Sequence, residues 1–270
     1  MDKDMRSKAL RDAMYGEAVG DALGVPYEFL ARDTFRCTDM VGYGSHHQPA
    51  GTWSDDTSMA VATADSIREL GRIDPADIHD RFADWLYRGR YACGGDTFDV
   101  GNTTAQAIRL GHGLAGEWDN GNGSLMRIAP LAFCDATDDE VRAVSAVTHA
   151  HELSCGLCVD FVHLLRAAAT DPEATHARLA ERAAGTPRDA VRSSGFVRHT
   201  YDAAIWCVGR SECYRDAVLL AVNLGEDTDT TGAVAGALAG TLWGIGGEHG
   251  IPQEWLRALR DRDVLEACLF

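Results

Sequence analysis

The chain has 270 residues, 46% of them hydrophobic and 24% charged, which suits one large globular domain or two small ones. No long polar low-complexity run is present, so the composition argues against disorder. The 41 acidic residues outnumber the 25 basic ones and give a formal net charge of −16, which argues against binding bare nucleic acid through its phosphates.

The N-terminal segment, residues 1–6, is polar, and no apolar stretch typical of a signal peptide follows it. No uninterrupted apolar run reaches the roughly 18 residues that a membrane helix needs. The eight cysteines are scattered along the chain and are expected to be mostly reduced. We therefore expect a cytoplasmic protein without a membrane partner.

The first predicted helix covers about residues 7–23, because Leu10, Met14 and Ala18 recur on one face. A second stripe with the same spacing consists of Gly16, Gly20 and Gly24. A glycine in a helix interior destabilises the helix by roughly 1 kcal/mol relative to alanine. Three glycines on one face therefore predict that this face packs closely against another helix. Glu28 follows in a short loop, where, taken alone, it is typical of a surface acid.

An irregular segment, residues 30–52, precedes a helix predicted from Asp55 to about Leu70. One acidic residue would be enough to cap this helix and to complement its dipole. Here Asp55 and Asp56 are adjacent and would project in different directions, which suits metal ligation. Capping and metal binding are equal alternatives for this segment when it is considered alone.

Two loops rich in glycine and asparagine follow the helix that Asp74-Pro75 begins. They cover residues 94–104 and 119–127, and their glycines would let backbone N–H groups approach a ligand. Such loops are weak evidence by themselves. The second loop carries Ser124 and Arg127, both of which are good phosphate partners.

Further helices are predicted in the second half of the chain. Thr137 and Glu140 form a capping box, and the helix that they begin is expected to reach His149. Later helices are expected at about residues 201–208 and 211–224. Pro252 would open the last helix, and no segment alternates convincingly as a strand. The sequence therefore predicts an all-α fold of ten or more helices in a single domain, residues 1–270.

A second acidic cluster lies in the segment 225–232, where Asp227, Asp229 and Thr230 begin a helix. Clustered carboxylates repel one another unless a cation lies between them, and Mg²⁺, Mn²⁺ and Ca²⁺ prefer such oxygen ligands. Glycines then recur every four residues at Gly232, Gly236, Gly240 and Gly244. This stripe mirrors the one in the first helix, so we predict that the two helices pack closely together. The two acidic helix starts would then be able to hold two ions.

With these motifs identified, the sequence resembles the ADP-ribosylglycohydrolase family. The matching segments occur in family order over nearly the whole chain, at residues 16–28, 52–59, 99–104, 121–130, 148–149, 193–197 and 223–232. The resemblance implies a compact orthogonal multi-helix bundle, a centre of two Mg²⁺ or Mn²⁺ ions, and hydrolysis of the bond between ADP-ribose and a protein side chain. The expected partners are an ADP-ribosylated protein as substrate and ADP-ribose as product, and we expect a monomer.

The resemblance also implies roles for individual residues. The metal ligands would be Ser54, Asp55, Asp56, Asp227, Asp229 and Thr230. Many members of the family have threonine in place of Ser54, and the hydroxyl is retained here. Asp55 or Asp56 would act as the base, with Glu28 positioning the ribose or serving as an alternative base. Asp99 matches a position that faces the guanidinium leaving group in arginine-directed members.

The implied substrate contacts are Asn102, Gly121, Asn122, Gly123, Ser124, Met126, Arg127, His149 and Phe196. Most of them belong to the loop around the diphosphate and ribose. His149 would face the ribose, and Phe196 would lie against the adenine. His46 and His47 are expected to be solvated or to face the ribose, because carboxylates are better ligands for hard ions.

Three functions agree with these observations. The first is hydrolysis of ADP-ribosylated arginine. The second is hydrolysis of another linkage, to serine, in O-acetyl-ADP-ribose or to a nucleic-acid base. The third is binding of ADP-ribose without catalysis.

Overall fold

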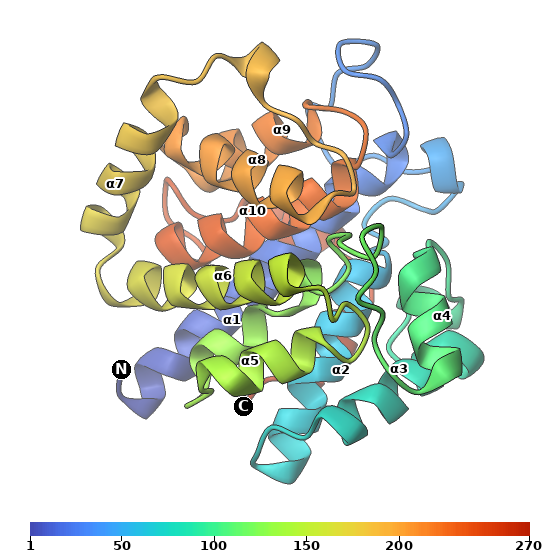
Figure 1. Cartoon of the computed structure of the whole chain (residues 1–270). Helices are drawn as coiled ribbons and strands as arrows, with labels where there is room; N and C mark the ends of the chain where they lie inside the picture. The colour runs from blue at the N-terminus through green and yellow to red at the C-terminus, as the bar shows by residue number, and fades with distance from the viewer.

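The computed structural model describes residues 1–270 and confirms an all-α fold (Figure 1). β-Pairing is limited to isolated bridges. The helices are α1 (Lys3–Gly24), α2 (Asp55–Leu70), α3 (Pro75–Arg88), α4 (Asn102–Leu110), α5 (Asp138–Ser145), α6 (Glu152–Thr170), α7 (Pro172–Ala184), α8 (Val197–Gly209), α9 (Tyr214–Val222), α10 (Thr228–Trp243), α11 (Gln253–Ala258) and α12 (Arg262–Ala267).

Helices α1 and α10 pack against each other along their two glycine stripes, as predicted. A Cβ atom added to Gly20 would lie 2.1 Å from the carbonyl oxygen of Gly232, and one added to Gly16 would lie 2.2 Å from that of Gly236. Backbone therefore contacts backbone, and no side chain fits between the helices. Gly244 follows α10 as its C-cap with a φ of 71°, and a Cβ atom added there would meet the side chains of Lys8 and Asp12 in α1 instead of the α1 backbone.

Several predicted helix ends need correction. Helix α5 ends at Ser145 and not at His149, because the backbone of Thr148 and Ala150 forms hydrogen bonds with Leu114 instead. Helix α8 begins earlier than expected and α9 later. Pro252 opens α11, but this is not the last helix, since α12 follows after Asp261.

The capping predictions are confirmed. Asp74 accepts hydrogen bonds from two backbone N–H groups at the start of α3, where Pro75 takes the first position. Thr137 and Glu140 form both hydrogen bonds of a capping box at the start of α5. These local signals fix helix starts because they satisfy N–H groups that have no partner within the helix.

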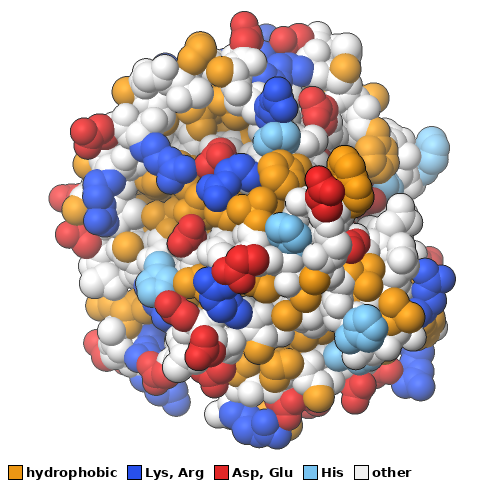
Figure 2. All heavy atoms as spheres, in the orientation of Figure 1, with side chains coloured by type: hydrophobic (Ala, Val, Ile, Leu, Met, Phe, Trp, Pro, Cys, Tyr) orange, Lys and Arg blue, Asp and Glu red, His pale blue; other side chains and the backbone are white.

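The core is one cluster of 70 buried hydrophobic residues that extends through most of the helices. Helix α6 is long and apolar enough to cross a membrane, yet half of its most apolar window is buried within the protein, and core helices meet the same criterion. On the face in Figure 2, acidic and basic side chains are interspersed, with hydrophobic patches between them.

Candidate functional site

The two acidic helix starts meet at one end of the α1–α10 interface because α1 holds both of them. Asp21 on α1 accepts hydrogen bonds from the backbone N–H of Ser54 (2.9 Å) and Thr57 (3.1 Å) and from the Thr57 hydroxyl (2.6 Å). The hydroxyl of Thr228 donates to the carbonyl of Gly24 at 2.8 Å. The C-terminal third of α1 therefore sets where α2 and α10 begin.

The carboxylates at these helix starts are buried and incompletely paired. One oxygen of Asp56, Oδ2, accepts from the hydroxyls of Ser54 (3.1 Å) and Thr230 (3.3 Å), which links α2 directly to α10. The other oxygen, Oδ1, has no partner, and the same is true of Asp229 Oδ2. A buried oxygen without a partner is costly, so these atoms fit a bound cation.

The electrostatics of the cluster lead to the same conclusion. Burial, together with repulsion from neighbouring carboxylates, raises the pKa of Asp55, Asp56 and Asp229 well above the usual range. A positive ion among these groups would favour their charged forms and lower each pKa. The donor set consists of carboxylate and hydroxyl oxygens, which hard divalent cations prefer.

A pocket of about 380 Å³ opens beside this cluster. Among the residues expected from the sequence, its lining includes Glu28, Asp55, Asp99, Asn102, Gly121, Asn122, Gly123, Met126, His149, Asp227 and Thr230. The structure thus brings residues from distant parts of the chain together around one cavity.

Asn122 connects the glycine-rich loop to the acidic cluster. Its side-chain amide donates to Asp227 Oδ2 at 2.7 Å and to the hydroxyl of Thr200 at 2.8 Å. A Cβ atom on Gly123 would lie 2.6 Å from Cε1 of His149, so only glycine lets the loop approach this ring. Burial and the nearby Arg127 lower the pKa of His149 to about 3, which leaves the ring neutral near pH 7.

Arg127 and Ser124 correct the sequence interpretation, which expected them at a phosphate. Arg127 is fully buried behind the loop, where it donates to the carbonyl of Gly123 (3.1 Å) and the hydroxyl of Thr148 (2.7 Å). Its guanidinium also lies 4.5 Å from the ring centre of Phe82. Ser124 is buried and accepts from the hydroxyl of Ser145 at 2.9 Å. Both residues support the loop from behind and do not line the pocket.

Phe196 lies beside the pocket without lining it, although the preceding residue, Gly195, does line it. It is half-buried and precedes α8, and its backbone pairs with Gly121. Its ring contacts His199 edge-on, with centroids 5.0 Å apart.

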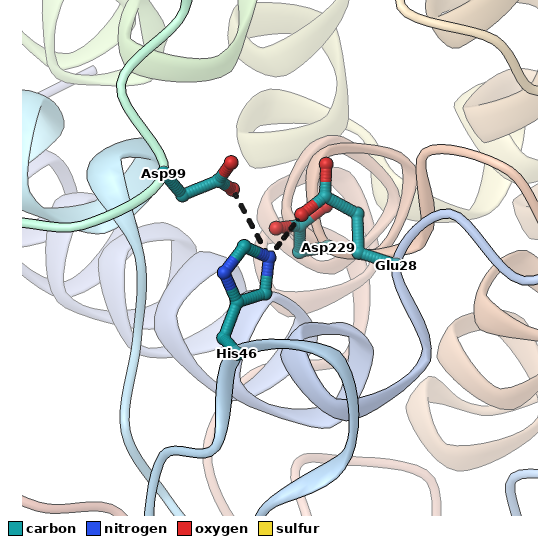
Figure 3. A group of neighbouring side chains, drawn as sticks. All are labelled: Glu28, His46, Asp99 and Asp229. Carbon is teal, nitrogen blue, oxygen red and sulfur yellow. Dashed lines mark hydrogen bonds and ion pairs between the residues drawn. The ribbon is translucent and has the colours of Figure 1, made fainter.

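Glu28 is buried and is not a surface acid. Burial, with repulsion from Asp99 and Asp227, raises its pKa to about 10. Its carboxylate is hydrogen-bonded to Nε2 of His46, which lies 3.9 Å from Asp99 Oδ2. Figure 3 shows His46 between these two acids, and ligand atoms of Glu28, His46, Asp99 and Asp229 all lie within 4.8 Å of one another.

The backbone around these acids adopts an uncommon conformation. Phe29, Asp99 and Glu226 have φ values of 66°, 54° and 63°, in the left-handed region that non-glycine residues rarely adopt. Two backbone hydrogen bonds join the strained segments, from Phe29 to Glu226 (2.7 Å) and from Glu226 to Leu30 (2.8 Å). The loop that carries Glu28 is therefore tied directly to the segment before Asp227. Such strain gathers at functional sites.

The family model for ADP-ribosylglycohydrolase matches residues 1–269. The chain belongs to the ADP-ribosylglycohydrolase family. It is 38% identical to the ADP-ribosylarginine hydrolase Tri1 of Pseudomonas putida (strain GB-1), over 91% of this chain and 72% of the relative. It is 32% identical to the ADP-ribosyl-[dinitrogen reductase] glycohydrolase of Rhodospirillum rubrum, over 92% of this chain and 88% of the relative.

A solved structure described as an ADP-ribosylglycohydrolase-related protein complex has a similar fold, with a TM-score of 0.81 and 32% sequence identity. The match covers 98% of this chain and 97% of that one. The family and these relatives identify the chain as an enzyme of the ADP-ribosylglycohydrolase type, and the family resemblance stated from the sequence motifs is confirmed.

Two residues of this ADP-ribosylglycohydrolase make contacts at the site that the sequence did not indicate. Asp21 lies in the largely apolar α1, and only its hydrogen bonds to α2 in the structure show that it holds the start of that helix. His46 was expected to be solvated or to face the ribose, but its side chain is only 13% exposed and contacts Glu28. No sequence signal links His46 to an acid 18 residues away.

Proposed function

We propose that this enzyme hydrolyses the N-glycosidic bond between ADP-ribose and arginine side chains of proteins. The observation that carries the proposal is the position of Asp99, opposite Glu28 in the pocket that adjoins the buried carboxylate cluster. A guanidinium is cationic and planar, and a carboxylate is its natural partner. The name ADP-ribosylarginine hydrolase on relatives that are 38% and 34% identical supports this choice of linkage.

The proposal includes two divalent ions, Mg²⁺ or Mn²⁺, held by Ser54, Asp55, Asp56, Asp227, Asp229 and Thr230. The unpaired oxygens of Asp56 and Asp229 support this assignment. When bound, such ions orient sugar hydroxyls and lower the pKa of water.

The residues of this chain would divide the remaining work. Water attacks the anomeric carbon, C1″, and the C1″–N bond breaks with its electron pair going to the guanidine nitrogen. Asp55 or Asp56 accepts the proton that the water loses. Asp99 holds the departing group and helps to protonate it by relaying a proton that replaces the one lost by the water, so that the products are ADP-ribose and arginine. Glu28 would position the ribose or serve as an alternative base.

The loop residues would orient the substrate. Neutral His149 has a ring nitrogen available for a ribose hydroxyl, because Thr148 contacts only Nδ1. Asn122 holds Asp227 in place through its amide. The backbone of Gly121 and Gly123 lines the pocket where the diphosphate would lie.

A panel of linkages tests the proposal. The enzyme, with Mn²⁺ or Mg²⁺, is given ADP-ribosylated arginine, ADP-ribosylated serine and O-acetyl-ADP-ribose, and release of ADP-ribose is measured. We expect turnover of the arginine substrate and its loss in Asp99→Ala. Turnover of serine or O-acetyl substrates alone would overturn the arginine assignment. Binding of ADP-ribose without turnover of any linkage would overturn the hydrolase assignment.

A further inference from the structure

The turn that carries His46 is fixed to the Glu28 segment by backbone contacts. The hydroxyl of Ser45 donates to the carbonyl of Glu28 at 2.6 Å. A Cβ atom on Gly44 would lie 2.0 Å from the carbonyl oxygen of Pro26, so the two segments touch there. The position of the His46 ring is therefore set relative to Glu28 before any side-chain contact is considered.

The ring of His46 also packs against two aromatic rings. Those of Phe29 and Phe98 lie 5.8 Å and 5.3 Å away between ring centroids, each tilted by 50°. Its Nε2 atom is hydrogen-bonded to Glu28 and lies 3.9 Å from Asp99 Oδ2 (Figure 3). One nitrogen thus faces both carboxylates at the same end of the pocket.

We infer that His46 is a positioning residue, which holds Glu28 and Asp99 at the spacing that receives the leaving group. The acidic groups of Glu28 and Asp99 disfavour each other's charged forms, and the hydrogen bond with Nε2 of His46 fixes the Glu28 carboxyl group beside Asp99. Without this hydrogen bond, the Glu28 side chain would turn away from Asp99. The inference rests on the proposed arginine linkage.

The same arrangement favours a planar cation over a neutral hydroxyl. Phe29 lines the pocket and is 73% exposed, so its ring is available to a guanidinium that lies between the two acids. An aromatic face attracts a cation within about 6 Å. A serine hydroxyl would use neither this ring nor the negative charge of Asp99. Loss of His46 should therefore reduce turnover of the arginine linkage more than turnover of a serine linkage.

The test compares three variants of the whole enzyme. His46→Met removes the hydrogen-bonding nitrogen at similar size, and His46→Gln keeps a polar group near the position of Nε2. His47→Gln is the matched control, because His47 is the next residue of the same turn and is exposed. For each variant, kcat and KM on ADP-ribosylated arginine and serine, the Kd of ADP-ribose by calorimetry, and Tm are measured.

We expect His46→Met to lower kcat on the arginine substrate by about 10- to 100-fold, since a displacement of about 1 Å can cost 10²-fold. The Kd of ADP-ribose and the kcat of His47→Gln should stay near wild type, and His46→Gln should restore most of the activity. Equal kcat values for His46→Met and His47→Gln would overturn the inference, as would an equal loss on both linkages.

Two further outcomes separate failure of the proposed arginine linkage from failure of the His46 variant to fold. If wild-type enzyme releases ADP-ribose from serine but not from arginine, the proposed linkage fails and the inference about His46 fails with it. If His46→Met does not fold, Phe29→Ala provides the measurement, because Phe29 is exposed. That variant should raise KM for the arginine substrate and leave the serine substrate unchanged, and an unchanged KM for arginine would overturn the inference.

Discussion

The α1–α10 interface and the acidic site at its end use the same two helices in opposite ways. Along the interface, glycines let backbone atoms touch, and a Cβ atom on Gly20 would lie 2.1 Å from a carbonyl oxygen. At its end, Asp56 and Asp229 have buried oxygens without partners. The interface is fully packed in the folded protein, whereas the acidic site keeps buried unpaired oxygens that fit the proposed cations.

This difference indicates that the interface contributes to stability and the acidic site to activity. The interface stabilises the fold and brings α1 close enough to α10 for Gly24 to bind Thr228, while Asp21 of α1 holds the start of α2. The acidic site costs stability, because burial disfavours each charged carboxylate. Changes in the interface should therefore reduce stability, and changes in the site should reduce activity without loss of stability.

Asp56→Asn should produce the largest effect. The amide keeps the shape of the side chain but removes a negative charge, so we expect kcat to fall by about 10³-fold, equivalent to about 4 kcal/mol in the barrier. The stability of the metal-free protein should be unchanged or higher, because carboxylate repulsion is relieved. Steady-state kinetics and urea unfolding in chelator check both effects. A variant that is both active and less stable would contradict the comparison.

Gly20→Ala should reduce the stability of the protein, in contrast to Asp56→Asn. The new methyl group would meet the backbone of Gly232, which is unable to move aside without separating the helices, so we expect a loss of about 3 kcal/mol of unfolding free energy. Gly156→Ala is the matched control, because Gly156 lies within α6 with nothing within 4 Å of its added Cβ. That control should be neutral or up to about 1 kcal/mol more stable. Equal stabilities in urea unfolding would show that the interface is not close-packed.

Divalent ions should stabilise the wild-type protein through the acidic site alone. At a concentration of about 100 times Kd, one bound ion adds about 2.7 kcal/mol to the unfolding free energy. Thermal unfolding with Mn²⁺ and then with excess chelator measures this gain and its reversal. Asp229→Asn should remove most of the gain, and a gain of the same size in that variant would place the ions elsewhere.

The stability of the metal-free protein should also depend on pH. In the folded state the pKa of Asp21 is raised to about 6 and that of Glu28 to about 10, chiefly by burial. The folded state therefore binds more protons than the unfolded state, and stability falls as pH rises through these values. Urea unfolding between about pH 6 and pH 9 should show this decline, with a smaller slope for Glu28→Gln. A stability that increases over this range would contradict the sign.

The local features of the sequence predicted what depends on local chemistry. Helix starts at Asp74 and Thr137, and the glycine stripes of α1 and α10, follow from capping and spacing alone. The end of α5 was wrong because a distant segment at Leu114 takes over the backbone hydrogen bonds there. Tertiary contacts of this kind leave no periodic pattern in the sequence.

The sequence was also unable to predict the tertiary contacts of the site residues. Asp55, Asp56 and the cluster at Asp227 and Asp229 were identified by the density of acids at two helix starts. Arg127 was expected at a phosphate because its residue type suits one, and only the structure places it behind the loop. Residue type and spacing select candidates, and packing decides which candidates reach the pocket.

The dependence of arginine-linked turnover on divalent ions tests the account most directly. Chelator-treated enzyme is given a protein with ADP-ribosylated arginine, and release of ADP-ribose is followed before and after addition of Mn²⁺. We expect no release before the addition and full turnover after it, with Asp56→Asn about 10³-fold slower than wild type after the addition. Undiminished turnover in chelator would contradict the account.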